Sequence, residues 1–249
     1  MEIFKDFADP SGPLSFLIRY AHVISGVTWI GLLYFFNFVQ VPAYAELSDG
    51  ARSEALRKLT FRALWWFRYA ALLTFLFGVA LLGIQGDGEN MDLYLSGTSG
   101  TAILTGMLLG ITMFLNVWGV IWRSQKVVIG SAETVAGGGQ ANPAAPGEAK
   151  KAGRASRCNT LFSIPMLFFM VFAAHGNIWF GQEIGGTAVY WVLVLAIWAV
   201  VEGSALGLIG GLDSAFCKLA FDKHRDTIIA GFGMLVVLYV VGWELLLHV

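Results

Sequence analysis

Six long apolar stretches constrain this 249-residue chain more than any other feature. Each holds about 20 mainly apolar residues, the length that a helix needs to cross the hydrocarbon core of a bilayer. The apolar runs are continuous rather than alternating, which argues against a transmembrane β-barrel. They cover roughly residues 14–41, 64–84, 101–122, 161–180, 188–209 and 228–247. The sequence therefore predicts an all-α, polytopic membrane helix bundle that forms a single integral membrane domain over residues 1–249.

The placement of basic residues predicts the topology of these spans. Every lysine and arginine except Lys5 and Arg19 lies in or beside the loops that follow the first, third and fifth spans. The other loops carry acidic residues such as Asp87 and Glu183. Cytoplasmic loops hold the excess of lysine and arginine in membrane proteins. We therefore expect the basic loops inside and both termini outside.

Two further segments bear on organisation. The tail before the first span holds more acidic than basic residues, and no small-residue cleavage site follows that span. The first span is therefore expected to stay in the mature protein rather than to be cleaved as a signal peptide. Residues 132–153 are rich in glycine, alanine and proline, which predicts a flexible cytoplasmic linker between two groups of three spans.

Composition and motifs argue against several classes of function. The net charge is −1, with 16 basic and 17 acidic side chains, so the chain has no electrostatic footprint for nucleic acid. Cys158 and Cys217 form no CxxC, CxxCH or zinc-ligand spacing, which argues against a disulfide scaffold, a structural zinc site and covalently attached haem. The chain also lacks a Walker A motif, a GxGxxG motif and a nucleophile elbow, so a kinase, nicotinamide enzyme or serine hydrolase has no support.

Two histidines lie within the predicted spans. His22 is in the first span and His175 is in the fourth, and these spans run in opposite directions. Helical rise places His22 about 12 Å and His175 about 8 Å from the predicted outer ends of their spans. Two imidazoles at one level of a helix bundle can supply both axial ligands of a b-type haem. We therefore predict haem b with His22 and His175 as its iron ligands.

The neighbours of His22 suit a haem. Arg19 and Gly26 lie on the same helix face as His22, one turn to either side. A guanidinium at residue 19 matches the geometry of a haem propionate, and a glycine lets a flat macrocycle approach the backbone. Trp29 continues this stripe toward the inner side.

In the fourth span, Phe172 and Trp179 flank His175 at helical spacing and are expected to wall the haem pocket. A simpler interpretation stays open for all these residues. Intramembrane histidines also bond neighbouring helices, and an arginine near a span end also snorkels to the interface. Glu202, in the fifth span, is a candidate proton-relay carboxylate or a neutral, hydrogen-bonded structural group.

Three segments carry a resemblance to a known family. RYAHVISGVTWIGLLYF (Arg19 to Phe35) resembles the first span of the membrane domain of bacterial membrane-bound urate oxidases, which reads R-W-L-H-x-I-x-G-x-x-W-I-G. NVWGVIWRSQK (Asn116 to Lys126) is similar to the asparagine-led end of that family's third span. RASRCNTLFSIPMLFFMVFAAH (Arg154 to His175) is similar to the family's span that reads asparagine-x-x-x-x-x-P and ends in a histidine. The matched positions in the first segment are Arg19, His22, Ile24, Gly26, Trp29, Ile30 and Gly31.

The resemblance implies a bacterial inner-membrane protein coupled to electron transfer. In that family urate is oxidised, electrons pass to a C-terminal cytochrome c domain at the outer face, and the two histidine positions correspond to His22 and His175. This sequence contains no CxxCH, so we expect either a separate c-type cytochrome to accept the electrons or another reaction on the same scaffold. A shorter and more distant likeness, a histidine early in a span followed by a tryptophan, resembles haem-containing membrane protoporphyrinogen oxidases.

Three functional hypotheses follow. The first is a membrane b-type haem redox protein, either an oxidoreductase acting on urate or a similar small molecule or a subunit of a respiratory complex. Quinone is a further candidate redox partner in this hypothesis. The second is a cofactor-free structural or assembly subunit, and the third is a small-solute transporter.

Overall fold

The computed structural model describes residues 12–88, 91–176 and 184–247, and within these it contains helices and no strand. Six helices are long and apolar enough to cross a membrane, which confirms the predicted all-α, multi-pass bundle. The first half consists of α1 (Pro13–Tyr34), η2 (Phe35–Gln40), α2 (Val41–Glu46), α3 (Asp49–Ala55), η3 (Leu56–Thr60), α4 (Phe61–Gly88), α5 (Met91–Ser96), α6 (Thr98–Asn116), η4 (Val117–Ile121) and α7 (Trp122–Ala136). The second half consists of α8 (Ala145–His175), α9 (Thr187–Ala205), α10 (Ala215–Phe221), α11 (His224–Val236) and η6 (Val237–Leu247), where η marks a π-helical segment.

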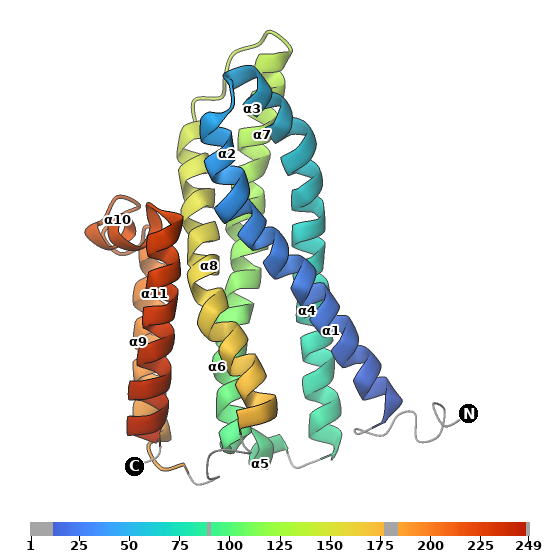
Figure 1. Ribbon diagram of the computed structural model, residues 1–249, viewed down its shortest axis with the longest axis vertical. Helices are drawn as coiled ribbons and strands as arrows, with labels where there is room; N and C mark the ends of the chain where they lie inside the picture. Colours follow the sequence, from blue (N-terminus) through green and yellow to red (C-terminus); the bar gives the residue numbers. More distant parts are fainter. Residues whose placement is uncertain (1–11, 89–90, 177–183, 248–249) are drawn as a thin grey trace.

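The first three spans are longer than their apolar stretches because π-helical turns join successive helices without a break. The continuous helices Pro13–Glu46, Asp49–Ile84 and Thr98–Ala136 hold 34, 36 and 39 residues. At 1.5 Å per residue these helices are roughly 50–60 Å long, whereas the hydrocarbon core is about 30 Å thick. They reach well past the shorter α9 and α11, and α10 lies partway along their length (Figure 1).

The linker expected over residues 132–153 is mostly helical, and this part of the prediction is wrong. Helix α7 continues to Ala136 and α8 already begins at Ala145, so only residues 137–144 form the connection. Alanine, glutamate and lysine after Ala145 are strong helix formers, and Pro146 occupies the first turn, where its missing N–H costs nothing. Ser124 also donates a hydrogen bond to Glu148, which holds the start of α8 against α7.

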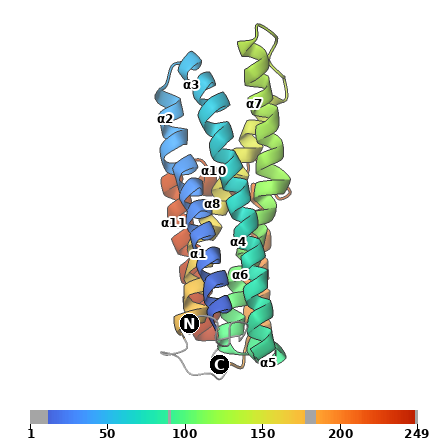
Figure 2. The same cartoon turned by 90° about the vertical axis from the view of Figure 1, so that its right-hand side faces the viewer.

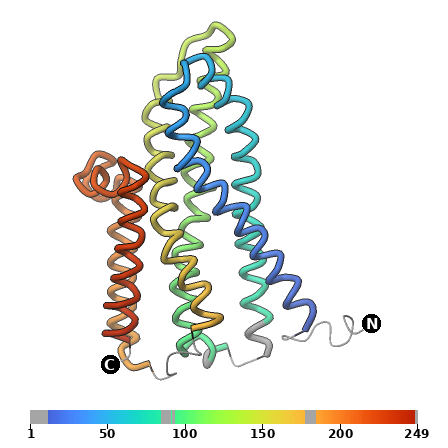
Figure 3. Tube along the Cα trace, viewed as in Figure 1, coloured from blue at the N-terminus to red at the C-terminus, as the bar shows by residue number. Residues whose placement is uncertain are grey.

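Helix α1 packs along α4, α6 packs along α8, and α9 packs on η6, and each of these pairs is antiparallel. Helix α11 also packs on α8, and these two helices run in the same direction (Figure 1). In Figures 1 and 3, α1 runs obliquely, and its N-terminal end lies away from α8. The start of α1, the end of α8 and the end of η6 all lie at one end of the bundle, opposite the α2–α3 and α7–α8 connections (Figures 1 and 2).

The bundle presents an apolar outer surface. Large side chains such as Phe16, Val27 and Leu76 are exposed on α1 and α4. Fully buried aromatic side chains fill the interior, among them Phe169 and Tyr190, which both pack near Trp243. An apolar exterior around a packed interior is the pattern expected of helices that contact lipid.

Candidate functional site

One large cavity brings five of the predicted haem residues together. It has a volume of about 1410 Å³ and is lined mainly by α1, α4, α6 and α8. We call it the histidine cavity, because His22 and His175 both line it, together with Arg19, Gly26 and Trp29. Pockets for drug-sized ligands usually measure about 300–1,000 Å³, so this volume suits a larger cofactor.

The orientation of His22 is fixed by the neighbouring helix α4. Its Nδ1 lies 2.8 Å from the carbonyl oxygen of Thr74. A carbonyl only accepts, so Nδ1 carries the hydrogen and Nε2 keeps a free lone pair. Gly78, one turn after Thr74, makes room for the ring, because a Cβ there would lie 3.1 Å from Cε1 of His22.

His175 shows the same arrangement on α8, where it is the last helical residue. Its Nδ1 lies 3.1 Å from the carbonyl oxygen of Val171, one turn earlier, and its ring is exposed. Nδ1 is again the donor and Nε2 again keeps its lone pair. Metal-binding histidines commonly donate their other ring N–H to a backbone carbonyl, which fixes the tautomer and the ring orientation.

The remaining α1 residues of the predicted site also line the histidine cavity. Arg19 is exposed and forms no ion pair among the residues that the structure describes. The Trp29 indole is 3% exposed, and within the described ranges its Nε1 has no hydrogen-bond partner. A Cβ at Gly26 would meet only Thr74 Cγ2, at 3.8 Å, so the chain's own packing does not require this glycine.

Two predicted wall residues are not placed in the cavity. Phe172 is buried on the far side of α8, where its ring centroid lies 4.9 Å from that of Trp243 and 5.8 Å from that of Tyr239. Phe172 therefore packs toward the helix formed by α11 and η6 rather than toward α1. Trp179 lies outside the described residues.

Several residues that line the histidine cavity could not be predicted from the sequence. Thr74 acts only through its carbonyl oxygen, which its residue type cannot reveal, and Gly78 matters only because α4 packs against His22. Met166 and Met170 of α8 also line the cavity. Met170 packs closely on Gly106 of α6, where a Cβ would lie 3.3 Å from its Cε atom, so this glycine serves helix packing.

Glu202 belongs to a separate polar cluster in the bundle core. Its Oε2 accepts hydrogen bonds from Asn116 Nδ2, at 3.1 Å, and from Cys158 Sγ, at 3.3 Å. Asn116 also donates to Asn159 Oδ1 at 3.0 Å. These bonds join α6, α8 and α9, and none of the four residues lines the histidine cavity. The geometry gives Glu202 a helix-joining role.

Comparison with known proteins adds no assignment to this geometry. No protein-family model, no curated protein and no solved structure matches the chain.

Proposed function

We propose that this chain is a membrane-embedded b-type haem redox protein, with haem held in the histidine cavity by His22 and His175. One observation carries the proposal. Two imidazoles from different helices line one cavity, and each donates Nδ1–H to a backbone carbonyl, which leaves its Nε2 able to bind iron.

The other residues of the cavity fit this group. Arg19 supplies a guanidinium that suits a propionate carboxylate. Trp29 supplies a buried N–H donor that lacks a protein partner among the described residues. Gly26 leaves open space where a side chain would otherwise stand. A bound haem supplies one-electron transfer, while the chain's own residues bind it, orient it and keep it within the bundle.

The proposal also includes a direction of electron flow. The basic connections lie in the half of the bundle away from the histidine cavity (Figure 1), and the excess of lysine and arginine in cytoplasmic loops supports placing that half on the cytoplasmic side. The cavity then lies near the outer face of a bacterial inner membrane. A c-type cytochrome or a respiratory complex accepts the electrons there, and urate or a similar small molecule donates them. This choice of donor is supported by the resemblance of residues 19–35 to membrane-bound urate oxidases. Quinone is a second candidate partner.

The test is a dithionite-reduced minus oxidised visible spectrum of the full chain, purified in detergent after expression with added haem. The expected result is a sharp b-type α band with about one haem per chain. His22→Ala and His175→Ala should each lose or shift this band, while His224→Ala is the matched control, because His224 is exposed in the opposite half of the molecule. An unchanged spectrum in both cavity variants would overturn the ligand assignment.

Electron donation is tested on the coloured protein. Urate should reduce the haem, and added cytochrome c should reoxidise it. Reduction by a quinol but not by urate would replace the donor while keeping the redox assignment. A colourless protein that stays folded would overturn the proposal in favour of a structural subunit or a small-solute transporter.

A further inference from the structure

A second cavity lies at the basic end of the bundle. It has a volume of about 340 Å³ and shares no lining residue with the histidine cavity. We call it the basic-end cavity. Its walls come from η2, α2, η3, α4, η4, α7, α8 and the end of α10. Three π-helical segments therefore meet around one hollow, and π-helical turns within α-helices occur frequently at functional sites.

Two buried amide oxygens in this cavity lack hydrogen-bond partners. Gln40 lies in η2 and Gln125 lies in α7, and both line the cavity. Among the described residues, nothing donates a hydrogen bond to Oε1 of either side chain, and Gln40 is 9% exposed. Buried polar atoms in folded proteins are nearly always satisfied by protein, by water or by a ligand. A bound molecule with N–H or O–H donors would satisfy both amide oxygens.

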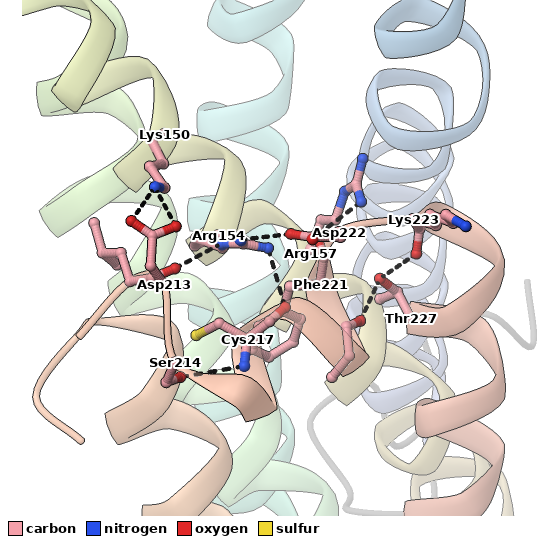
Figure 4. Close-up of polar contacts among 12 residues, drawn as sticks. Lys150, Arg154, Arg157, Asp213, Ser214, Cys217, Phe221, Asp222, Lys223 and Thr227 are labelled. Carbon is pink, nitrogen blue, oxygen red and sulfur yellow. Dashed lines mark hydrogen bonds and ion pairs between the residues drawn. The ribbon is translucent and has the colours of Figure 1, made fainter. Parts of the chain in front are cut away.

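The charges around the cavity do not balance. Three cationic side chains and one carboxylate line it. Lys150 pairs with Asp213 at 2.5 Å and Arg154 pairs with Asp222 at 2.6 Å (Figure 4). Arg157 donates to the backbone oxygen of Phe221 at 2.7 Å, but no carboxylate of the described residues forms an ion pair with it. Asp222 also interacts electrostatically with Arg157, so the two guanidiniums share one carboxylate and the wall carries one excess positive charge.

We propose that the basic-end cavity binds a small organic monoanion that carries hydrogen-bond donors. The single negative charge balances the excess positive charge that Arg154 and Arg157 leave at the wall, and the donors bond the amide oxygens of Gln40 and Gln125. A volume of about 340 Å³ lies at the small end of the range for ligand pockets, roughly 300–1,000 Å³, so the ligand is the size of one substituted ring. The proposal is independent of haem, because the two cavities are separate.

The test uses three probes that differ in one property each. Orotate is a planar ring with two N–H donors and a carboxylate. Uracil keeps the ring donors but lacks the carboxylate, and benzoate keeps a ring carboxylate but lacks the donors. Binding is measured by equilibrium dialysis with the full chain in nanodiscs of phosphatidylcholine, a lipid without net charge. Orotate is expected to bind saturably at one site per chain, and uracil and benzoate at least about tenfold more weakly.

Variants locate the site. Gln40→Leu and Gln125→Leu keep the side-chain size but remove the acceptor, so each should weaken orotate about five- to tenfold and leave the weak binding of benzoate unchanged. Gln140→Leu, at an exposed glutamine, is the matched control. Arg157→Gln should weaken orotate and leave uracil unchanged, with the exposed Arg123→Gln as its control.

The glutamine variants keep the test valid if Arg157→Gln fails to fold. Removing an unsatisfied buried acceptor does not itself cost stability, so a folded Gln40→Leu protein is expected. Equal affinity for all three probes, no binding of any of them, or unaltered orotate binding in both glutamine variants would overturn the proposal. Water would then be the occupant of the cavity.

Discussion

Replacing Gly78 by alanine tests the coupling between α4 and the histidine cavity. A Cβ at this position would lie 3.1 Å from Cε1 and 3.3 Å from Nδ1 of His22. Both distances are shorter than an ordinary carbon contact of about 3.5–4.0 Å. The ring must therefore move by a few tenths of an ångström, and this movement strains the 2.8 Å hydrogen bond from Nδ1 to Thr74.

The expected loss of stability in Gly78→Ala is obtained by comparison with Gly83, a second glycine of α4. Overpacking a buried site costs about 1–3 kcal/mol. Exchange of glycine for alanine within a helix is favourable by about 0.5–1 kcal/mol. At Gly83 an added Cβ meets nothing within 4 Å, so Gly83→Ala shows the helix effect alone. We expect Gly78→Ala to be less stable than Gly83→Ala by about 1–3 kcal/mol.

The assay is reversible unfolding in mixed micelles of a mild detergent and sodium dodecyl sulfate, followed by circular dichroism for both variants. The visible spectrum gives a second readout, because a displaced His22 should lower haem content or shift the α band only in Gly78→Ala. Equal unfolding free energies and equal spectra for Gly78→Ala and Gly83→Ala would refute the placement of His22 against α4.

Three further predictions concern the polar contacts of the bundle. Glu202→Ala should cost about 1–3 kcal/mol in the same unfolding assay, because it leaves buried donors unpaired, while Glu202→Gln should cost less because it keeps an acceptor oxygen; equal losses would contradict this. Arg154→Gln should cost about 1.5–3 kcal/mol, because Arg154 is 8% exposed and bonds a carboxylate and two carbonyls. Lys150→Gln should cost less than Arg154→Gln, because its ion pair with Asp213 is exposed, and the reverse order would be evidence against the α8–α10 contacts. The hydrogen bond from Lys150 lowers the pKa of Asp213 below its ordinary value of 3.8. The stability that this pair contributes should be present above about pH 4 and lost as the pH falls through the folded pKa, and melting curves of Asp213→Asn should lack this dependence.

The sequence by itself determined the number and type of the spans. A continuous apolar run of about 20 residues has to be helical in a bilayer, because the hydrocarbon cannot satisfy backbone N–H and C=O groups. The same rule placed His22 and His175 inside spans, and helical periodicity placed Arg19, Gly26 and Trp29 on the face of His22. All five line the histidine cavity.

Only the tertiary structure decided which neighbour each face meets. Periodicity groups residues on one side of a helix, but it does not say which helix that side contacts, so Phe172 was expected beside a haem and instead packs on Trp243. The backbone acceptor of His22 and the space left by Gly78 depend on how α4 packs against α1, not on residue type. The basic-end cavity likewise exists because π-helical turns in three separate segments meet along α8, a long-range arrangement that no local pattern encodes.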